Sequence, residues 1–443
     1  MKTFKLGGIH PSENKFSAKQ AIKTAPIPAQ AVIMLGQCLG APSTPLVAKG
    51  DEVKVGTLLA KPSGFVSTSV HASVSGKVLK IEDVVDASGY KRAAIVIDVA
   101  GDEWEPSIDR SPAIVKEITA TKEEIIAKVA EFGIVGLGGA TFPTHIKLTP
   151  PPGKIAEVLL INAVECEPYL TSDHQLMLEK GEEILVGVRL LMKAIGVSKA
   201  IIGIENNKPD AIELLSRIAQ QYSEIEICPL KVQYPQGGEK QLIDATIGRQ
   251  VPSGTLPIEV GAVVQNVGTA FAVYEAVQKN KPLFERIITV TGKSVKKPAN
   301  LLARIGTPLS ELIDFCGGLP DDTGKVIGGG PMMGKALTTL SVPMTKGSSG
   351  LLIMPSLEAE RGKMNNCIRC AKCVSVCPMG LEPFLLMSLS EQEIADWATA
   401  EQQHIMDCVE CGSCSYTCPS NRPLLDYIRL GKNKVGGIIR SRK

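Results

Sequence analysis

Two matching runs of cysteine in the last quarter of the chain constrain its fold more than any other feature. Each run has the spacing C-x2-C-x2-C-x3-C and is followed by a proline; the first begins at Cys367 and the second at Cys408. Such a spacing is typical of chains that hold two [4Fe-4S] clusters, in which the fourth cysteine of each run binds the cluster of the other run. We therefore expect one cluster on Cys367, Cys370, Cys373 and Cys418, and a second on Cys377, Cys408, Cys411 and Cys414.

Two other uses of these cysteines agree less well with the spacing. A zinc site favours two separated C-x2-C pairs, and three closely spaced cysteines would crowd a tetrahedral ion. A disulfide framework needs an oxidising, secreted context, and the sequence opens without the pattern of a signal peptide. The other four cysteines stand singly, which indicates a reducing compartment and a cytoplasmic protein: Cys38, Cys166, Cys228 and Cys316.

Basic residues accompany the two runs. Arg369, Lys372 and Arg422 could ease the reduction of an anionic cluster, or could form an ordinary solvated face. The amphipathic stretch 381–406 predicts helices that bring the two runs together. Residues 431–443 have the composition of a basic tail, which could touch anionic lipid or move freely in solvent: Lys432, Lys434, Arg440, Arg442 and Lys443.

Length and charge exclude some classes of protein. With 443 residues the chain has room for several domains. No apolar run reaches the length of a membrane-spanning helix. The formal net charge is only +2, and no basic stripe with interleaved aromatic residues occurs, which argues against a nucleic-acid-binding protein.

The N-terminal part of the chain predicts an arm and a small β domain. Residues 1–40 lack a regular pattern and suggest an arm that wraps over another domain. Residues 41–100 alternate short β-branched runs with glycine turns. They resemble the barrel-sandwich hybrid of biotinyl and lipoyl carriers, but the stretch 64–71 has no lysine to carry a prosthetic group. We therefore expect a structural or docking role for this domain.

Three further units follow a linker at 101–120. Residues 121–285 alternate strand-like and helix-like stretches, which predicts a layered α/β domain. Residues 286–350 have the length and pattern of a compact β-grasp module. Residues 355–430 would form an α-helical domain around the two cysteine runs, similar to two-cluster ferredoxins. The predicted fold class is therefore multidomain α/β.

A glycine loop in the α/β domain is the first of three stretches that folding alone does not require. It runs from Gly136 through Gly138 and Gly139 to Lys147, and it lacks the third glycine and the preceding strand of a dinucleotide-binding fingerprint. Its bare backbone N–H groups could still meet a phosphate or a flat ring. Glycines that serve only tight turns are an equally good explanation of the loop alone.

Two more groups of polar residues belong to the same domain. An apolar strand at 158–162 delivers Asn162, Glu165 and Glu167 at its carboxyl end, where α/β sheets place ligands. Paired carboxylates there suit acid–base chemistry or the binding of ribose hydroxyls, and the second use agrees better with a phosphate loop nearby. The stretches 234–242 and 263–269 place further polar side chains next to glycine, which suits ribityl and phosphate oxygens or the rim of a flavin.

Together these stretches resemble the flavoprotein of respiratory complex I. Residues 136–147, 162–168, 234–242 and 265–269 are similar to four of its motifs and occur in the same order. That flavoprotein carries one cluster, whereas this chain has two cysteine runs and an additional N-terminal β unit. Over nearly its whole length the chain is similar to the C subunits of the Rnf family of electron-transport complexes, which share the opening motif Gly-Gly-Ile-His-Pro found here from Gly7.

The resemblance implies FMN, NAD(H) and the residues that bind them. Phe142 would stack on the nicotinamide or the adenine, and Glu167 and Glu239 would bind NADH. Contacts to FMN are implied for the loop that begins at Gly136 and for the residues that match the complex I motifs: Gly138, Gly139, Lys147, Asn162, Glu165, Tyr234, Gly237, Asn266 and Thr269.

The resemblance also implies a function. A chain of this family would pass electrons between NAD(H) and ferredoxin through FMN and two [4Fe-4S] clusters, coupled to Na⁺ or H⁺ translocation. Its partners would be the integral-membrane and ferredoxin-like Rnf subunits, and it would be peripheral at the cytoplasmic face of the membrane. Two alternatives stay open, a soluble flavin and iron–sulfur cobalamin reductase and a non-catalytic docking scaffold. Four positions depart from the complex I motifs: Leu137, Val164, Gly238 and Gln265.

Overall fold

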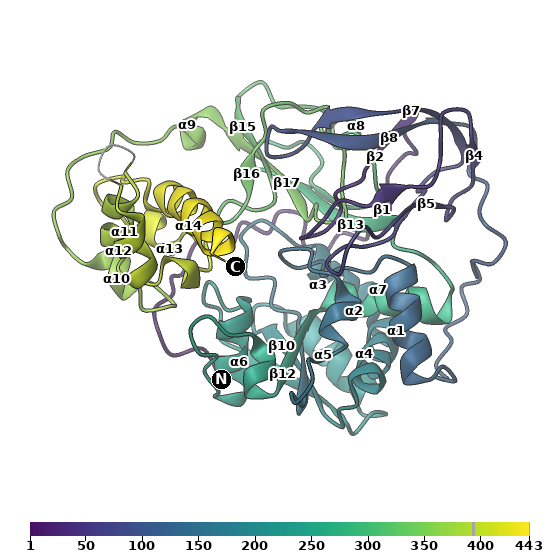
Figure 1. The fold of residues 1–443 in the computed structure, drawn as a ribbon, viewed down its shortest axis with the longest axis horizontal. Coiled ribbons are helices and arrows are strands. Elements are labelled where there is room, and N and C mark those ends of the chain that lie inside the picture. The colour runs from purple at the N-terminus through teal and green to yellow at the C-terminus, as the bar shows by residue number, and fades with distance from the viewer. Residues whose placement is uncertain (392–394, 443) are drawn as a thin grey trace.

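The computed structural model describes residues 1–391 and 395–442, so Lys443 of the expected basic tail lies outside the described part. Figure 1 shows how the units are arranged. The small β domain and the β-grasp module lie side by side at the top, the α/β domain lies below them, and the C-terminal cysteine domain lies to the left. The N-terminal arm (purple) passes from the α/β domain along the cysteine domain before it reaches the β-grasp module.

The small β domain consists of two antiparallel sheets around one apolar core. Its strands are β2 (Gln30–Met34), β3 (Thr44–Pro45), β4 (Glu52–Val53), β5 (Leu58–Lys61), β6 (Val70–His71), β7 (Gly76–Val85) and β8 (Lys91–Val99). The sheets have the orders β2-β8-β7-β4 and β3-β5-β6. In β2, Ala31 and Ile33 face the core and alternate with more exposed residues. The domain therefore begins before residue 41, because part of the expected arm is the strand that pairs with β8.

The α/β domain carries a parallel sheet, as the sequence predicts. Its strands are β9 (Val158–Asn162), β10 (Ala200–Glu205), β11 (Ile225–Leu230) and β12 (Ala262–Asn266), in the order β11-β10-β9-β12. Its helices are α1 (Lys122–Glu131), α2 (Thr144–Lys147), α3 (Ser172–Glu179), α4 (Gly181–Ile195), α5 (Pro209–Ala219), α6 (Glu239–Ile247), the short η1 (Pro257–Val260) and α7 (Val267–Gln278).

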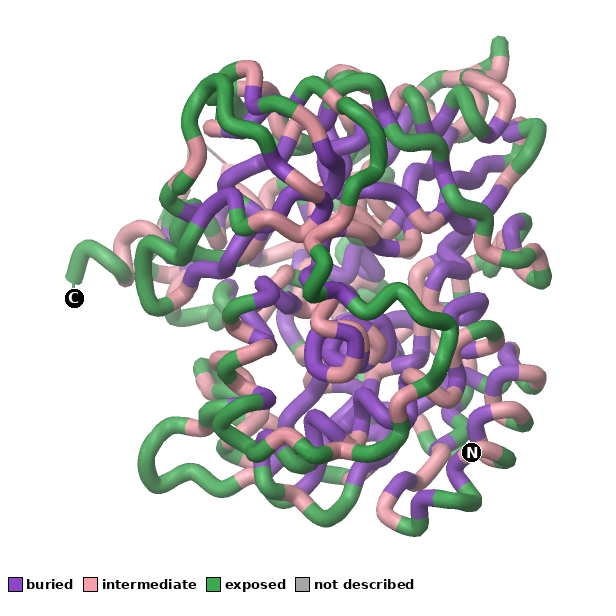
Figure 2. Tube along the Cα trace, turned by 90° about the vertical axis from the view of Figure 1, so that its right-hand side faces the viewer, coloured by how far each residue is buried: buried purple, intermediate pink, exposed green. Residues whose placement is uncertain are grey.

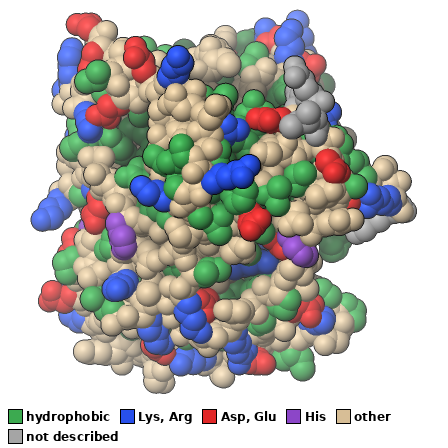
Figure 3. Space-filling view, turned by 90° about the vertical axis from the view of Figure 1, so that its left-hand side faces the viewer, with side chains coloured by type: hydrophobic (Ala, Val, Ile, Leu, Met, Phe, Trp, Pro, Cys, Tyr) green, Lys and Arg blue, Asp and Glu red, His purple; other side chains and the backbone are tan. Residues whose placement is uncertain are grey.

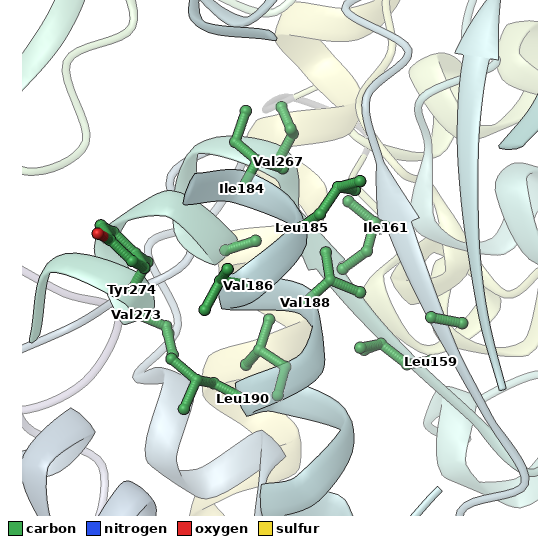
Figure 4. Packing of buried hydrophobic residues seen from close by; sticks show 14 of the residues in the cluster. Leu159, Ile161, Ile184, Leu185, Val186, Val188, Leu190, Val267, Val273 and Tyr274 are labelled. Atoms are coloured by element: carbon green, nitrogen blue, oxygen red, sulfur yellow. The ribbon is translucent and has the colours of Figure 1, made fainter. Parts of the chain in front are cut away.

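Helix α4 forms the centre of this domain's core. Its apolar side chains face β9 on one side, and Figure 4 shows Leu185 directed toward Ile161. On the other side α4 lies very close to α7, because a Cβ at Gly187 would come within 1.9 Å of the Ala270 carbonyl oxygen. Figure 2 shows the buried segments (purple) running through the interior of both halves of the molecule. The α/β core therefore fixes the strands whose ends carry the expected site.

The β-grasp module is a six-stranded mixed sheet that recruits a strand from the arm. Its elements are β1 (Lys23–Thr24), β13 (Glu285–Thr291), β14 (Ala299–Arg304), α8 (Leu309–Phe315), β15 (Thr323–Gly328), β16 (Lys335–Ala336) and β17 (Gly350–Pro355). The sheet has the order β1-β14-β13-β17-β15-β16, and β1 adds in parallel to β14. The arm is thus part of two domains: β1 in this sheet and β2 in the small β domain.

A buried lysine joins three of the units. Lys346 is 1% exposed, and its Nζ donates to the carbonyl oxygens of Ser69 in the small β domain (2.8 Å) and Gly133 in the α/β domain (2.7 Å). Desolvation lowers the pKa of Lys346 to about 7. This contact holds the small β domain and the β-grasp module against Gly133, three residues before the glycine loop.

The cysteine domain is helical. Its elements are α9 (Ser356–Ala359), α10 (Lys372–Ser375), α11 (Pro383–Leu389), α12 (Trp397–Gln402), η2 (Ile405–Asp407), α13 (Ser413–Tyr416) and α14 (Leu424–Ser441). The expected helices between the two runs are α11 and α12. The expected basic tail is instead the second half of α14, because Val435 and Gly436 are buried and hold it in the domain. No described helix is both long and apolar enough to cross a membrane.

Candidate functional site

The site expected in the α/β domain lies where the strand order of the sheet reverses. From β9 the chain moves outward to β10 and β11, and then returns to add β12 on the other side of β9. Open α/β sheets bind ligands at such switch points, beyond the carboxyl ends of the strands. Asn162 ends β9, Asn266 ends β12, and the two are paired in register. Two of the residues expected to contact a cofactor therefore lie together at the switch point.

The glycine loop lies over this point and is anchored from its inner side. The Leu137 N–H donates to Thr269 Oγ1 at 2.9 Å. Gly138 packs on Asn266, because a Cβ at Gly138 would lie 2.6 Å from Asn266 Nδ2. On the outer side, a Cβ at Gly139 would meet nothing within 4 Å. The loop is therefore fixed from below and open above.

The rim of the site carries an aromatic ring and an ion pair. The Gly136 N–H donates to the Phe142 carbonyl oxygen at 2.9 Å, which closes the loop and leaves the Phe142 side chain half-buried. Lys147 Nζ lies 2.6 Å from Glu239 Oε1 and also donates to the Val264 carbonyl oxygen at 3.2 Å. The two charged side chains are 31% and 39% exposed, so the pair borders solvent.

Several of the expected cofactor ligands have side chains that bind the protein itself, among them Asn162, whose Nδ2 donates to the Gly237 carbonyl oxygen at 2.7 Å. Asn266 Oδ1 accepts the Thr269 N–H and caps α7, while Asn266 Nδ2 donates to Asp173 at 2.7 Å. Thr269 is fully buried beneath the glycine loop. Glu165 Oε1 accepts the Asp173 N–H at 2.8 Å, at the positive end of α3. In this structure Glu165, Asn266 and Thr269 shape the loops around the site.

The two glutamates after β9 are not a pair in space. Glu165 has a φ of 46°, which breaks the alternation that would send both side chains the same way. The Glu167 carboxylate turns to the β-grasp module, where it accepts the N–H groups of Met332 (2.7 Å) and Met333 (3.0 Å). Burial raises the pKa of Glu167. The expectation of paired carboxylates at this strand end is therefore wrong.

Buried charges that the sequence analysis missed support the same loop. Lys15 Nζ donates to three backbone carbonyls of the segment after β9, at distances of 2.7 to 3.0 Å. Lys208 Nζ donates to the Val164 carbonyl oxygen at 2.7 Å. Burial, and next the neighbouring Glu165 carboxylate, raise the pKa of Asp173 to about 7. No local pattern marks these residues, because each acts through partners far away in sequence.

Tyr234 connects the site to the cysteine domain. Its side chain is buried, and its hydroxyl donates to the Cys411 carbonyl oxygen at 2.8 Å. On the site's side, the Gly237 N–H donates to Cys166 Sγ at 3.3 Å. Tyr234 and Cys411 belong to one small apolar cluster, against which Cys166 packs. The wall of the switch-point site is therefore also a wall of the cysteine domain.

Four of the run cysteines line one cavity and are called the inner quartet below: Cys377, Cys408, Cys411 and Cys414. They are the four that the spacing assigns to one cluster. The remaining wall is mainly apolar and includes Leu386 and Ile428. Helix α14 holds the cavity from one side, because Lys432 Nζ donates to the Cys408 carbonyl oxygen at 2.7 Å. Lys432, expected to touch lipid or solvent, therefore serves the cysteine domain.

Backbone and burial both act on the sulfurs of the inner quartet. The Leu381 N–H donates to Cys377 Sγ and the Glu410 N–H donates to Cys408 Sγ, each at 3.4 Å. Burial raises the pKa of Cys408 to about 11 and that of Cys414 to about 12. The neutral thiol is thus favoured unless the positive charge of a metal stabilises the thiolate. Four thiols and inward N–H groups around one cavity suit an iron–sulfur cluster.

The other four run cysteines are called the outer quartet: Cys367, Cys370, Cys373 and Cys418. Cys373 and Cys418 pack against the same apolar cluster, which contains Cys414, whereas Cys367 and Cys370 are exposed. Among the described residues, no three His, Cys, Asp or Glu side chains lie close enough to hold a single ion. A cubane has a wider ligand set, since each thiolate binds a different iron.

The two cysteine runs repeat one backbone conformation. Arg369 and Glu410, each two residues after the first cysteine of its run, have φ values of 54° and 57°. Ala371 and Gly412, two residues later, have φ values of 57° and 77°. A short helix follows in both cases, α10 in the first run and α13 in the second. The repeated spacing is therefore a repeated structure.

The switch-point site has features that suit FMN. The outer side of the glycine loop is open at Gly139, so bare backbone N–H groups can approach an anionic or flat ligand. Gln265, the residue before Asn266, is buried, and its Nε2 has no hydrogen-bond partner among the described residues. An unpaired buried donor in the strand that ends at the switch point is suited to a ligand rich in acceptor oxygens and ring nitrogens.

Comparison with known proteins agrees with this description. Four family models match: the RnfC barrel sandwich hybrid domain at 2–102, the Nuo51 FMN-binding domain at 129–275, the SLBB domain at 287–336 and the 4Fe-4S dicluster domain at 363–422. These matches confirm the expected domain types and the expected cofactors, FMN and iron–sulfur clusters.

Three curated relatives, each the C subunit of its complex, match nearly the whole chain. The relative from the proton-translocating ferredoxin:NAD(+) oxidoreductase complex of Clostridium ljungdahlii is 46% identical over 98% of this chain and 94% of its own. The relative from the Na(+)-translocating ferredoxin:NAD(+) oxidoreductase complex of Acetobacterium woodii is 45% identical over 98% of this chain and 97% of its own. The relative from the ion-translocating oxidoreductase complex of Rhodobacter capsulatus is 42% identical over 97% and 82%.

Among solved structures, a chain of an NAD+-reducing [NiFe]-hydrogenase in the H2-reduced state is a distant likeness, with a TM-score of 0.49 and 19% identity over 71% of this chain and 63% of that one. The curated relatives are far closer in sequence and cover all four domains. By this similarity the chain belongs to the Rnf family, among the C subunits of the ion-translocating ferredoxin:NAD(+) oxidoreductase complexes.

Proposed function

We propose that this chain exchanges electrons with NAD(H) at an FMN on the switch-point loops and passes them through the inner and then the outer quartet, toward or from ferredoxin. FMN supplies the conversion between a hydride donor and one-electron carriers. The relatives' names associate this chemistry with the translocation of protons or Na⁺, and we propose the same coupling for the complex that contains this chain.

Residues of the glycine loop have the surroundings to hold the FMN. Gly138 and Gly139 would offer backbone N–H groups, whereas the Gly136 N–H closes the loop on the Phe142 carbonyl oxygen. Asn162 would approach from the end of β9 with the Nδ2 hydrogen that is not donated to the Gly237 carbonyl oxygen. Three expected ligands would instead hold the loops that contact FMN, because their side chains are bonded to the loop backbone: Glu165, Asn266 and Thr269. This division revises the direct contacts that the resemblance implies for those three residues.

The rim residues are suited to NAD(H). Phe142 is half-buried at the mouth of the glycine loop, where its ring could stack on a flat group. Glu239 borders solvent and is held by Lys147, so it could accept ribose hydroxyls without losing its ion pair. Glu167 is turned away to Met332 and Met333, so we propose that it orients the loop rather than the nucleotide.

The main support for the proposal is that Tyr234 lies between the loop expected to contact FMN and the inner quartet. Its main chain lies in the loop expected to contact FMN, and its hydroxyl binds the backbone of Cys411 in the inner quartet. Cys166 of the loop after β9 packs on the same apolar cluster. A flavin on these loops would therefore lie next to the inner quartet, with no domain between them.

We also propose partners and a location. As a member of an Rnf complex the chain would bind the other Rnf subunits, and it would be peripheral at the cytoplasmic face of the membrane. Figure 3 looks onto the side of the molecule that bears the cysteine domain, where hydrophobic and basic side chains are mixed. The exposed residues near the outer quartet include Ile368, Arg369 and Lys372, which suit an acidic electron-transfer partner.

The decisive experiment compares two ion pairs of nearly equal geometry in the anaerobically prepared, FMN-loaded chain. In Glu239→Ala the pair at the rim is lost; we expect the KM for NADH to rise roughly tenfold, the cost of about one good hydrogen bond to a charged group, with unchanged cluster spectra. The control is Glu259→Ala, which removes the partner of Lys154, also at 2.6 Å and similarly exposed, but at the opposite end of the sheet.

The outcomes separate the proposal from its rivals. If Glu239→Ala and Glu259→Ala had the same KM for NADH, Glu239 would not bind the nucleotide. A chain that holds its clusters and FMN but never oxidises NADH with a dye acceptor would be a docking scaffold. A chain that reduces a corrinoid substrate on its own, and does not co-purify with integral-membrane subunits, would be a soluble cobalamin reductase.

A further inference from the structure

The N-terminal arm occupies the seam between the α/β domain and the cysteine domain. Its first residues attach to the edge of the α/β domain: the Lys231 N–H donates to the Lys2 carbonyl oxygen at 3.0 Å, and the Lys5 N–H donates to Asp244 Oδ2 at 2.9 Å. Phe4 between them is buried. In Figure 1 the purple trace then runs along the cysteine domain. The arm is therefore a packed element rather than a loose end.

The next residues of the arm bond to both redox sites within two positions. Ile9 and Tyr234 exchange a pair of backbone hydrogen bonds, with Ile9 N–H to Tyr234 O at 2.8 Å and Tyr234 N–H to Ile9 O at 2.9 Å. The Gly8 N–H donates to the carbonyl oxygen of Val376, the residue before Cys377, at 3.0 Å. Two adjacent residues of the arm thus hold the loop of the switch-point site and the backbone of the inner quartet.

Glycine is required where the arm passes the inner quartet. Gly7 has a φ of 71°, a conformation that L residues with side chains rarely adopt. A Cβ at Gly7 would also lie 2.6 Å from both the carbonyl carbon and the carbonyl oxygen of Cys377, which belong to backbone and cannot swing away. The arm therefore touches the main chain of a cysteine expected to bind iron.

The arm is placed to fix a distance. Tyr234 is held at its backbone by Ile9 and at its hydroxyl by Cys411, and Gly8 is held by the residue before Cys377. The loop at 234–242, which is expected to contact FMN, is called the flavin loop below. These bonds connect the flavin loop, the arm and the inner quartet in a closed triangle. Electron transfer between two fixed centres falls steeply with distance, so a small widening of this triangle has a large effect on the rate.

We propose that the arm, through Gly7, Gly8 and Ile9, is a positioning element that sets the spacing between the flavin loop and the inner quartet. The inference rests on the proposed function, in which FMN and a cluster occupy these two places. In the step concerned, the reduced flavin loses one electron and the cluster gains it, and no covalent bond forms or breaks. Gly7, Gly8 and Ile9 touch neither reacting group and act only through Tyr234 and the inner quartet.

The test uses Gly7→Ala in the full, cofactor-loaded chain. Stopped-flow mixing with NADH separates the bleaching of the flavin from the bleaching of the clusters. We expect flavin reduction to keep its wild-type rate, and electron transfer to the clusters to slow roughly tenfold or more, because angstrom-scale misplacement has effects of that size. The matched control is Gly153→Ala, since Gly153 also has a positive φ (80°) but a Cβ there would meet nothing within 4 Å.

A second readout does not depend on turnover. Hydrogen exchange of the cofactor-free chain, followed by mass spectrometry of peptides that cover the arm and the loop at Tyr234, should be faster in Gly7→Ala and unchanged in Gly153→Ala. If Gly7→Ala loses iron, Ile9→Ala replaces it, because it trims the side chain packed on Tyr234 without backbone strain. For Ile9→Ala we expect a slowing of a few-fold with full iron content.

The results discriminate between this inference and the proposed function. Wild-type cluster reduction and wild-type hydrogen exchange in Gly7→Ala, or in Ile9→Ala where Gly7→Ala loses iron, would overturn the role of the arm and leave the proposed function intact. A wild-type chain in which NADH bleaches the flavin but never the clusters would overturn the proposed function instead.

Discussion

The inner and outer quartets each combine three cysteines of one run with the fourth cysteine of the other run, but their surroundings are very different. The inner cysteines line a largely apolar cavity, next to Tyr234 and beneath helix α14. In the outer quartet Cys367 and Cys370 are exposed, and the chain from 361 to 372 is exposed throughout. One motif therefore yields a buried site that faces the flavin loops and an exposed site that faces solvent.

The difference shows how two copies of one motif can give clusters with different neighbours. A buried cluster next to the flavin loops can exchange electrons only inside the protein, whereas an exposed cluster can meet another molecule. The N-terminal arm and α14 create this asymmetry, since the arm packs on Cys377 of the first run and α14 on Cys408 of the second, so that both cover the inner quartet. The repeat alone would give two equivalent sites, and the long-range contacts bury one of them next to the loop at Tyr234 and leave the other exposed.

The largest expected effect comes from removing one ligand from each quartet. Cys411→Ala should lose about four of about eight irons, and NADH should then reduce the flavin while the outer cluster is reduced roughly 100-fold more slowly or not at all. Cys370→Ala should lose a similar amount of iron and still show NADH-dependent reduction of the inner cluster. Iron analysis and EPR spectra of both variants measure this, and equal behaviour of the two would break the comparison.

A smaller effect is expected for access from solvent. Iron should leave the outer quartet at least about tenfold faster than the inner quartet when a chelator is added, because a local opening that costs only about 1.4 kcal/mol already gives that factor. Release should therefore be biphasic in the wild-type chain. In Cys370→Ala only the slow phase should remain, and a single rapid phase there would show that the inner cavity is not protected.

Charge at the outer quartet should have a several-fold effect. Arg369→Glu combined with Lys372→Glu should slow electron exchange with an acidic ferredoxin roughly fivefold at low salt, and added salt should reduce the difference. NADH-dependent reduction of the inner cluster should not change. Lys122→Glu combined with Arg217→Glu, two exposed positions on the α/β domain, is the matched control. A slowing as large as that of the first pair would mean that net charge alone matters.

The smallest effect concerns Asp173, which is buried at the switch-point site in the domain next to the inner quartet. Because the pKa of Asp173 is raised to about 7 from an ordinary value of 3.8, the folded chain retains a proton that the unfolded chain has lost between about pH 4 and pH 7. The free energy of unfolding should therefore fall as pH rises through this window. Asp173→Asn should flatten that dependence in urea unfolding between pH 5.5 and about 8. An unchanged slope would contradict the raised pKa.

Sequence spacing predicts how the cysteines are grouped, because the grouping follows from a local rule about two adjacent runs. The four cysteines that this rule assigns together line one cavity. The strand pattern at 158–162 was also enough to place Asn162 at a strand end, and the parallel sheet then brings it into register with Asn266. Local periodicity carries this information, so the α/β layering and the general position of the site follow from the sequence.

The rest depends on contacts between distant parts of the chain. The side chains of Glu165 and Glu167 diverge because Glu165 adopts a positive φ that alternation cannot anticipate. Lys15 supports a loop about 150 positions away. Position 7 requires glycine because its φ is positive and because the Cys377 backbone lies against it. Such contacts leave no periodic trace, so the seam between the flavin loops and the inner quartet becomes visible only in three dimensions.

The order of the redox centres can be tested directly by pulsed EPR of the one-electron-reduced flavin in variants that keep a single cluster. Cys370→Ala retains the inner cluster and Cys411→Ala retains the outer one. The buried seam at Tyr234 predicts a shorter flavin-to-cluster distance, and so a stronger relaxation enhancement of the flavin signal, in Cys370→Ala. A stronger enhancement in Cys411→Ala would contradict the assignment of the inner quartet as the flavin's neighbour.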